Sequence, residues 1–281
     1  MNRLLWEPIV RAALVEDLGR AGDITTDAIV PAGRTATAYV VARADGVVAG
    51  VEPSLAAFTL YDPTVRVDAH VGDGACVRRG DRIATIDGPA RALLTAERTC
   101  LNLLGHLSGI ATATRHVVAA AAPHGAAIVD TRKTTPGLRA LEKAAVRAGG
   151  GANHRFGLDD AVLIKDNHIA VAGGITAAVQ AARTHAGHLV KIEVEVDSLA
   201  QLDEALGLPV DVVLLDNFTP DALHEAVRRV RAKAHARPIL TEASGGIRPD
   251  DVAAVAAAGV DLISMGWLTH SAPNLDVALD F

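Results

Sequence analysis

Residues 191–230 decide the fold class of this chain, and they read KIEVEVDSLAQLDEALGLPVDVVLLDNFTPDALHEAVRRV. Runs rich in valine and leucine, at 190–196 and 210–216, have the length of buried strands, and each precedes a stretch of helical length. Residues that favour helix starts mark both helices, Ser198 after Asp197 and Thr219 before Pro220. The stretch therefore predicts two consecutive strand–helix units of a parallel sheet.

The same alternation extends over the chain from about residue 126 onward. Six strands are predicted, at 127–130, 161–165, 190–196, 210–216, 238–243 and 261–265, each followed by a helix. Polar residues end almost every one of these strands, and no GxGxxG turn opens the first unit. These two features favour a closed or nearly closed α/β barrel over an open doubly wound sheet.

The residues before this region predict a separate α/β domain. A helix is expected near 7–18, an alternating strand at 35–42 and a second helix after Pro53. Glycine–aspartate turns at 71–74 and 79–81 resemble those of a biotinyl or lipoyl half-barrel, but no lysine stands in the hairpin, so a structural sandwich is expected. Residues 89–122 are helical in pattern, with a break or tight packing expected at Gly105 and Gly109. Placing the boundary at that point gives domains at 1–108 and 109–281.

The composition narrows the classes of function. The 281 residues carry a formal charge of −6 and no long basic run, which argues against a nucleic-acid partner. No apolar run reaches the ~18 residues of a membrane span, and the first residues lack the order of a signal peptide. We therefore expect a cytoplasmic protein without a membrane partner. Cys76 and Cys100 are too few for a disulfide framework and lack the spacing of a zinc site.

Basic side chains gather in or near the loops that follow the first two predicted strands: Arg132, Lys133, His154, Arg155 and Lys165. In a barrel, such loops surround one mouth, where active sites lie. Each of these residues alone fits a solvated surface charge equally well. Five of them beside two adjacent strand ends predict a multiply anionic ligand, because an unpaired cation facing a cleft is costly.

Carboxylates and glycines end the later strands. Glu195 and Asp216 end adjacent strands, where they could bind ribose hydroxyls, hold magnesium through water, stabilise a ribosyl cation or form structural salt bridges. The segment Ser244-Gly245-Gly246 and Gly266 follow the last two strands, where barrels often bind a phosphate through backbone N–H groups. Ordinary turn formation explains an isolated Ser-Gly-Gly as well, so its position on a late strand carries the inference.

Read together, these segments resemble the quinolinate phosphoribosyltransferase family, from Gly22-Asp23-Ile24-Thr25 almost to the end of the chain. The motifs that carry the resemblance are Glu97-Arg98-Thr99, Ser108-Gly109-Ile110-Ala111-Thr112, Thr131-Arg132-Lys133-Thr134, Asn153-His154-Arg155, Lys165-Asp166-Asn167-His168, Glu193-Val194-Glu195-Val196, Leu215-Asp216-Asn217, Ser244-Gly245-Gly246 and Leu268-Thr269-His270-Ser271. Trp267 departs from the pattern, since the family usually has a small residue there. No residue of the expected chemistry is replaced.

The resemblance implies a fold and an assembly. It implies an N-terminal α/β sandwich domain and a C-terminal open seven-stranded α/β barrel, similar to a TIM barrel. It also implies a homodimer with shared active sites, in which the sandwich of one subunit caps the barrel of the other. The six strands predicted above are one fewer than such a barrel has.

The resemblance further implies an activity in de novo NAD biosynthesis. Quinolinate and phosphoribosyl pyrophosphate would be converted to nicotinate mononucleotide, pyrophosphate and CO2. The residues implied as catalytic are Lys133, Lys165, Glu195 and Asp216, of which Glu195 and Asp216 would face the ribose and hold a Mg2+ ion through water. The quinolinate carboxylates would be bound by Arg132, Lys133, His154, Arg155 and Lys165, with Arg98 from the other subunit, and the 5-phosphate by Ser244, Gly245, Gly246, Gly266 and His270.

Two alternatives to this activity remain. A phosphate-binding barrel enzyme of another class, such as an isomerase or lyase, would share the Ser-Gly-Gly loop but would not need the basic cluster. A non-enzymatic accessory homologue, such as a companion of molybdenum transport, would keep the fold. Loss of catalytic side chains would support that second alternative, and in this sequence they are intact.

Overall fold

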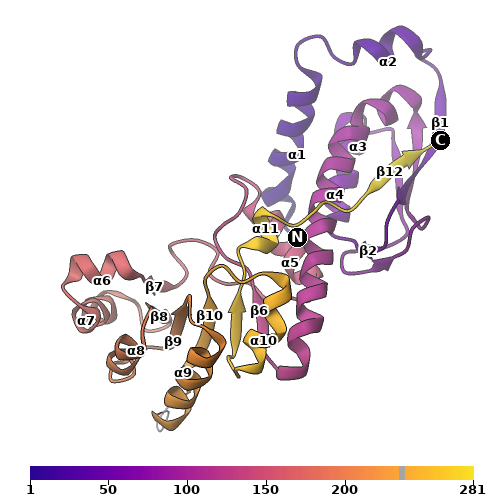
Figure 1. The fold of residues 1–281 in the computed structure, drawn as a ribbon. Coiled ribbons are helices and arrows are strands. Elements are labelled where there is room, and N and C mark those ends of the chain that lie inside the picture. The colour runs from indigo at the N-terminus through magenta and orange to yellow at the C-terminus, as the bar shows by residue number, and fades with distance from the viewer. Residues whose placement is uncertain (234–237) are drawn as a thin grey trace. The chain divides into compact units, whose positions relative to one another are not determined.

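The computed structural model describes residues 1–233 and 238–281, which form two compact units (Figure 1). Unit one consists of Met1–Arg115, Thr134–Gly150 and Leu268–Phe281, and unit two of the described parts of His116–Lys133 and Gly151–Trp267. Each unit is thus assembled from segments that are distant in sequence. The expected domains, 1–108 and 109–281, are continuous in sequence and remain a prediction.

The described residues contain helices throughout both units. The helices are α1 Arg3–Leu18, α2 Ile24–Ile29, α3 Val51–Tyr61, α4 Ala90–Ala121, α5 Arg139–Ala148, α6 Asp166–Ala172, α7 Ile175–His185, α8 Leu199–Ala205, α9 Pro220–Lys233, α10 Val252–Ala257 and α11 Trp267–His270, with 3-10 turns η1 Ala122–His124 and η2 Pro249–Asp251. Across this described part of the chain, no helix has the length and apolar character needed to cross a membrane.

The strands of residues 1–233 and 238–281 belong to three sheets. They are β1 Thr35–Ala42, β2 Gly46–Val47, β3 Arg66–Ala69, β4 Cys76–Val77, β5 Arg82–Pro89, β6 Ala127–Val129, β7 Val162–Ile164, β8 Ile192–Val196, β9 Val212–Asp216, β10 Leu240–Ser244, β11 Leu262–Ser264 and β12 Val277–Asp280. Two of the sheets hold most of the strands, one in each unit, and the short pair β2 and β4 forms the third.

Unit one is built on an antiparallel sheet in the order β12-β1-β5-β3. Strand β1 coincides with the alternating strand predicted at 35–42, and it pairs with β5 on one side and β12 on the other. The partner β12, yellow in Figure 1, comes from the end of the chain, and Tyr39 pairs with Asp280. With helices α1 and α3 packed together and α3 in contact with β3, this sheet forms the predicted α/β sandwich.

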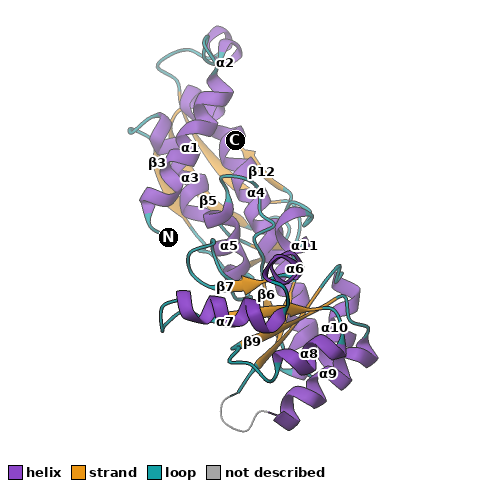
Figure 2. Ribbon diagram, turned by 90° about the vertical axis from the view of Figure 1, so that its left-hand side faces the viewer, coloured by secondary structure: helices purple, strands orange, loops and turns teal. Residues whose placement is uncertain are grey.

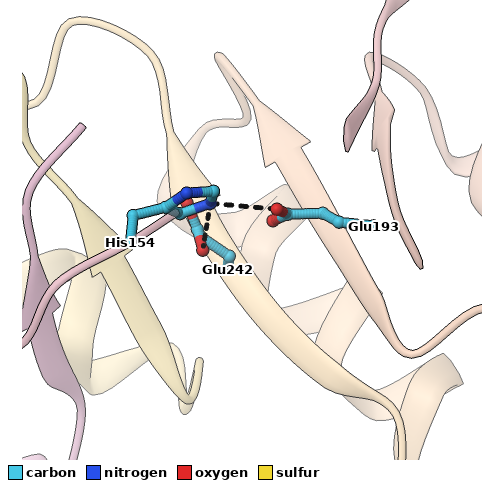
Figure 3. Close-up of side chains that lie close together, drawn as sticks. All are labelled: His154, Glu193 and Glu242. Carbon is cyan, nitrogen blue, oxygen red and sulfur yellow. Dashed lines mark hydrogen bonds and ion pairs between the residues drawn. The ribbon is translucent and has the colours of Figure 1, made fainter. Parts of the chain in front are cut away.

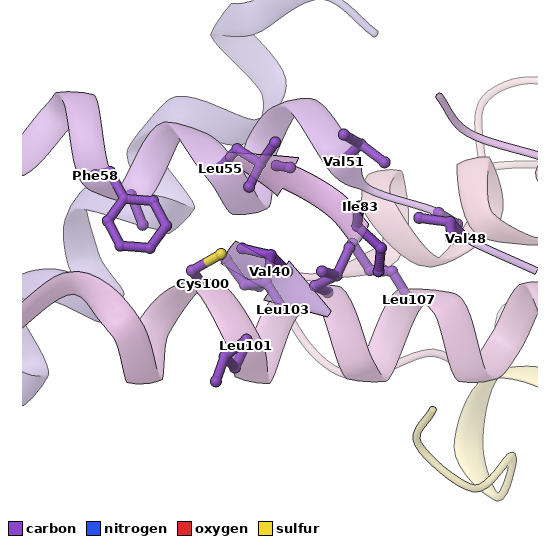
Figure 4. Close-up of a cluster of buried hydrophobic side chains, with 14 of the residues drawn as sticks. Val40, Val48, Val51, Leu55, Phe58, Ile83, Cys100, Leu101, Leu103 and Leu107 are labelled. Carbon is purple, nitrogen blue, oxygen red and sulfur yellow. The ribbon is translucent and has the colours of Figure 1, made fainter. Parts of the chain in front are cut away.

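Apolar side chains fill the space between the sheet and the helices of unit one (Figure 4). Val40 of β1 and Ile83 of β5 are fully buried in the same cluster as Phe58 of α3 and Cys100 of α4. Burying each large side chain of this kind contributes about 1.5–3 kcal/mol. Burial, together with the nearby carboxylate of Glu97, raises the pKa of the Cys100 thiol, so this cysteine stays a protonated packing residue.

Helix α4 corrects one expectation about this region. It runs without interruption through Gly105 and Gly109, so the expected break does not exist and tight packing is the explanation for both glycines. A Cβ atom at Gly109 would lie 2.1 Å from the carbonyl oxygen of Pro273, and one at Gly105 would lie 3.0 Å from that of Leu275. The C-terminal segment therefore crosses α4 at a distance that only glycine permits.

Unit two is built on a parallel sheet in the order β6-β11-β10-β9-β8-β7. All six strands are found where they were predicted, with bounds that differ from the predicted ranges by at most two residues. A single parallel bridge between Val129 and Ala152 continues the sheet beyond β6. In the part of the chain that is described, this bridge occupies the place of the seventh strand that the family resemblance implies, and the α/β class is confirmed.

Helices α8, α9 and α10 lie side by side along one side of these strands (Figure 2). Two of the predicted start signals are used: Ser198 Oγ accepts from Gln201 N–H at 3.4 Å and Thr219 Oγ1 from Ala222 N–H at 3.3 Å. Such caps satisfy N–H groups that have no partner within their own helix. Because the strands are parallel, their carboxyl ends lie at one edge of the sheet, together with the loops that follow them.

Candidate active site

The parallel register brings the predicted strand-end residues to one edge of the sheet. Glu195 of β8 pairs with Leu214 of β9, and Asp216 lies two residues beyond Leu214, so the two carboxylates are on the same face. Asp216 in turn pairs with Ser244 at the end of β10. Lys165 follows β7, whose last residue pairs with Val194, and therefore stands level with Glu195.

Lys165 and Glu195, both predicted as catalytic, form an ion pair. Lys165 Nζ lies 2.9 Å from Glu195 Oε2, with 47% of the lysine side chain and 15% of the glutamate side chain exposed. The backbone N–H of Lys165 donates to His168 Nδ1 at 3.0 Å, which holds the first turn of α6. An ammonium and a carboxylate thus share the strand edge, both within reach of solvent.

The turn after β9 is held in an unusual backbone conformation. Asn217 has φ 57°, and it is the one residue other than glycine with positive φ among those described. Its side-chain amide donates to Asp216 Oδ2 at 2.6 Å, and its backbone N–H donates to the carbonyl of Ser244 at 3.0 Å. Such strain is typical of functional sites, where it fixes a side chain in place. Here it fixes the carboxylate of Asp216.

The Ser-Gly-Gly segment packs against that turn. Gly245 has φ 97°, and a Cβ atom there would lie 2.3 Å from Asn217 Oδ1 and 2.7 Å from Asn217 N. Gly246 also has positive φ, at 59°, but a Cβ atom there would meet nothing within 4 Å. The backbone at Gly246 is therefore open to approach by a ligand, as a phosphate-binding loop requires.

Two arginines of the predicted basic cluster lie close to one another. Burial is the main cause that lowers the pKa of the Arg155 guanidinium, and the positive charge of Arg132 adds to the effect. Arg155 Nη1 donates to the carbonyl of Ala161 at 3.1 Å. Arg132 and Lys133 are exposed, with the N–H of Lys133 donating to Thr131 Oγ1 at 3.0 Å. Two neighbouring cations of this kind favour an anion between or beside them.

His154 belongs to a cluster that the sequence did not reveal (Figure 3). Its Nε2 lies 2.9 Å from Glu193 Oε2 and 3.6 Å from Glu242 Oε2. Both glutamates are buried on strands β8 and β10, and Oε1 of each has no hydrogen-bond partner in the described structure. Burial, reinforced by the negative charge of Glu193, raises the pKa of Glu242 to about 8 despite the opposing effect of His154.

The three side chains of this cluster also have the residue types of a metal site, with ligand atoms within 4.8 Å of one another. The hydrogen bonds argue against that use. The backbone N–H of Arg155 donates to His154 Nδ1 at 2.8 Å, so Nδ1 carries no proton. The hydrogen-bond pattern assigns the proton to Nε2, which donates to Glu193 and has no lone pair to offer a metal.

Arg98 and His270 belong to unit one, whereas the other predicted site residues belong to unit two. Arg98 is exposed on α4 and lines a cavity of about 270 Å³, whose wall includes Asp23 and Thr95. His270 ends α11, and its Nδ1 lies 2.6 Å from Ser271 Oγ. Gly266 and Trp267 are both half-buried, with Trp267 as the first residue of α11.

Family models match nearly the whole chain. The N-terminal domain of quinolinate phosphoribosyl transferase matches residues 23–108, and its C-terminal domain matches residues 110–280. The chain belongs to the quinolinate phosphoribosyl transferase family. The resemblance inferred from the motifs is thus confirmed over both halves of the sequence.

Full-length relatives in this family support the same membership. The chain is 46% identical over 280 residues to a probable carboxylating nicotinate-nucleotide pyrophosphorylase of Bacillus subtilis, covering 100% of this chain and 94% of the relative. It is 48% identical over 276 residues to the carboxylating nicotinate-nucleotide pyrophosphorylase of Mycobacterium leprae, with 96% and 95% covered. Among solved structures, NadC from Streptococcus pyogenes is similar with a TM-score of 0.93 and 38% identity, over 100% of this chain and 97% of the other.

Within unit two of this family member, the structure brings several predicted residues together and adds others. Lys165 contacts Glu195, Asp216 lies beside the Ser-Gly-Gly segment through Asn217, and Arg155 lies near Arg132. Glu193 and Glu242 were missed as functional candidates. In the sequence Glu193 is only part of a motif, and the available signal was a carboxylate within a predicted strand rather than at its end.

Proposed function

We propose that this chain is a carboxylating nicotinate-nucleotide pyrophosphorylase, which joins quinolinate to the ribose of phosphoribosyl pyrophosphate and releases pyrophosphate and CO2. The observation that carries the proposal is the strand edge where Lys165 and Glu195 form an ion pair next to the conformationally fixed Asp216. The names of the full-length relatives support it.

In the proposed reaction the ring nitrogen of quinolinate displaces pyrophosphate from the anomeric carbon of the ribose. The bond to pyrophosphate breaks as the bond to nitrogen forms, so positive charge develops on the ribose and then on the ring. Carboxylates fixed beside that carbon stabilise this charge, and Glu195 and Asp216 are the pair we assign to it. The carboxylate next to the nitrogen then leaves as CO2, its bonding electrons pass into the cationic ring, and a proton takes its place.

The basic residues are assigned to substrate binding and positioning. Arg132, Lys133, Arg155 and Lys165 supply cations for two ring carboxylates, and the open backbone at Gly246 accepts a phosphate. Holding both substrates in a reactive geometry lowers the barrier without a covalent nucleophile. This division of roles also argues against an isomerase or lyase with a similar phosphate loop, because such an enzyme would not need this basic cluster.

The residues present fit a magnesium ion. Glu195 and Asp216 offer oxygen ligands on one face of the sheet, and two carboxylates suit an ion that keeps several waters and binds substrate phosphate oxygens. Bound Mg2+ would neutralise charge on the leaving pyrophosphate. Within the protein itself, Asn217 holds Asp216 toward that position by donating to its Oδ2.

The direct test is to incubate purified protein with quinolinate, phosphoribosyl pyrophosphate and magnesium, and to follow nicotinate mononucleotide by chromatography. Formation of the mononucleotide with one CO2 per product supports the proposal. An absence of product from folded protein, with or without magnesium, contradicts it and would favour a non-enzymatic homologue.

Substrate choice gives a second test. Because the basic cluster offers more cations than one carboxylate needs, nicotinate should be a poor substrate, with kcat/KM lower than that of quinolinate by a factor of about 10² or more, as expected when buried polar groups are left unpaired. Comparable turnover of nicotinate and quinolinate under the same conditions would contradict recognition of the second carboxylate.

A further inference from the structure

We propose that Glu193 and Glu242 are positioning residues that act through His154 to place the Arg155 guanidinium for an anionic substrate. The inference rests on the proposed function and adds two residues that belong to neither the basic cluster nor the carboxylate pair of the reaction. It is carried by a continuous path of hydrogen bonds and close contacts in unit two.

The first part of the path runs from the two glutamates to the imidazole (Figure 3). His154 Nε2 donates to Glu193 Oε2 at 2.9 Å, and Glu242 Oε2 lies 3.6 Å from the same nitrogen. The two carboxylates come from β8 and β10, the strands on either side of β9. The ring edge is therefore held from two directions by rigid strands, which limits the rotation of His154.

The second part of the path runs from the imidazole to Arg155. His154 Nδ1 accepts from the backbone N–H of Arg155 at 2.8 Å. Both ring nitrogens form hydrogen bonds within the protein, so the position of the ring constrains the backbone of Arg155, the next residue along the chain. A shift of the ring toward or away from Glu193 must move the backbone from which the Arg155 side chain extends.

The backbone of the same segment is held from the other side by a third buried carboxylate. Asp130 is fully buried directly after β6. Its Oδ1 accepts from the backbone N–H of His154 at 2.9 Å, and its Oδ2 accepts from the side-chain amide of Asn153. Residues 153–155 are thus held by carboxylates from β8, from β10 and from the residue that follows β6, although they form no helix or strand of their own.

The free-energy cost of burying Glu193 and Glu242 argues that they have a functional role. Glu193 and Glu242 are buried, and Oε1 of each has no hydrogen-bond partner in the described chain. Replacing buried polar or ionic groups of this kind by apolar side chains is often neutral or stabilising, so stability alone does not explain them. Arg155, by contrast, has a long side chain whose rotamer freedom opposes binding, and a fixed backbone reduces that loss.

The test is a double-mutant cycle on quinolinate binding, measured by calorimetry with the purified full chain. Glu193→Gln keeps the shape of the side chain but replaces a charged acceptor by a neutral one, and Arg155→Lys keeps one cation so that binding stays measurable. We expect Glu193→Gln to weaken quinolinate binding about tenfold in the wild-type background, in line with the effect of misplacing a binding group. In the Arg155→Lys background the same change should weaken it less than twofold.

Steady-state kinetics give an independent readout. Glu193→Gln and Glu242→Gln should raise the KM of quinolinate while the KM of phosphoribosyl pyrophosphate changes less than twofold. His154→Gln, whose amide can still donate to Glu193, should retain more quinolinate affinity than His154→Ala. The matched control is Asp261→Asn, because Asp261 accepts from Thr241 N–H at 2.8 Å at the opposite end of β10 and β11. It should lower the melting temperature without changing either KM.

Three results would overturn the inference. Additive effects of Glu193→Gln and Arg155→Lys would show that Glu193 does not act through Arg155. Equal rises in both KM values would show a general structural role. A stoichiometric metal bound by wild type and lost in His154→Gln, detected by elemental analysis, would show that the cluster is a metal site instead. If wild type itself neither binds quinolinate nor forms product, the proposed function fails first, and the two failures are thereby distinguished.

Discussion

At the scale of single residues, a substitution of Lys165 can distinguish a structural role from a chemical one. The Lys165 side chain is 47% exposed in its ion pair with Glu195, and exposed pairs of this kind contribute only about 0–1 kcal/mol to stability. Losing a cation that binds a substrate anion costs about 2–5 kcal/mol of binding. Lys165→Ala should therefore lower kcat/KM far more than it lowers the melting temperature, as measured by enzyme assay and thermal unfolding.

Lys191→Ala is the matched control for that change. Lys191 also forms an ion pair, 3.5 Å from Asp211, but it stands just before β8, at the opposite end of the strand from Glu195. It should affect stability as little as Lys165→Ala and leave the activity unchanged. A large fall in melting temperature for Lys165→Ala with preserved specific activity would assign Lys165 to structure.

Glu242 predicts a pH dependence of stability. Burial and the charge of Glu193 raise its pKa to about 8 in the folded protein, against an ordinary value of 4.5, while His154 opposes the rise. Below about pH 4.5 the Glu242 carboxyl is protonated in both the folded and the unfolded protein. Between that pH and about 8 the folded state keeps a proton that the unfolded state has lost, so this group makes the free energy of unfolding fall as pH rises, by at most ~1.4 kcal/mol per pH unit.

Glu242→Gln removes this dependence because an amide does not titrate. The free energy of unfolding of the variant, relative to wild type, should rise from pH 5 to pH 8 and become constant above it. Urea denaturation at one-unit intervals measures the difference. Parallel curves for the two proteins across that range would contradict the raised pKa, since Glu193 and His154 are present in both.

At the scale of elements, the C-terminal segment crosses α4 so closely at Gly109 that a larger residue should not fit there. A Cβ atom at this position would lie 2.1 Å from Pro273 O and 2.8 Å from Asn274 Cα, both backbone atoms that cannot rotate away. In an open helix, Gly→Ala stabilises by up to about 1 kcal/mol. Here Gly109→Ala should instead destabilise by about 1–3 kcal/mol, the usual cost of overpacking.

Urea denaturation of a graded series checks this explanation. Gly105→Ala should cost less than Gly109→Ala, because its nearest contact, Leu275 O, is 3.0 Å away. Gly187→Ala should be nearly neutral, since a Cβ atom there meets nothing within 4 Å. Equal effects at Gly105 and Gly109 would mean that helix propensity rather than the crossing segment governs both positions.

The same helix shows what the sequence could and could not predict about elements. Strand β1 and the starts of α8 and α9 were predicted correctly because alternation and capping residues are local signals. Of the two alternatives expected at Gly105 and Gly109, tight packing is confirmed and the break is wrong. The sequence could not decide between them, because a glycine that ends a helix and one that admits a neighbour look alike in sequence. The pairing of β12 with β1 had no local signal, since it joins residues such as Tyr39 and Asp280 from opposite ends of the chain.

The site shows the same division between local and distant signals. Polar residues at strand ends could be predicted, and parallel strands then bring Lys165, Glu195 and Asp216 to one edge. Glu193 and Glu242 could not be found in this way, because they lie within strands and their partner His154 is in a loop. Which buried carboxylate meets which side chain depends on the stacking of side chains inside the sheet, and no spacing rule encodes that.

At the scale of the whole molecule, the division into two units bears on how the active site is completed. Arg98 belongs to unit one, and the other residues assigned to the quinolinate carboxylates belong to unit two. We propose that this arginine serves the barrel of the partner subunit in a homodimer. A twofold dimer would then contain two equivalent shared sites.

Mixing two inactive variants tests this assembly. Arg98→Ala and Lys133→Ala should each be nearly inactive, because each dimer of either variant lacks one required cation at both sites. In a refolded equal mixture about half of the dimers are hybrids by random pairing, and each hybrid has one site with both residues intact. Activity should therefore recover to about a quarter of wild type on those statistics. If Arg98 acted within its own subunit, every site would carry one defect or the other, and no activity would return even when native mass spectrometry confirms hybrid dimers.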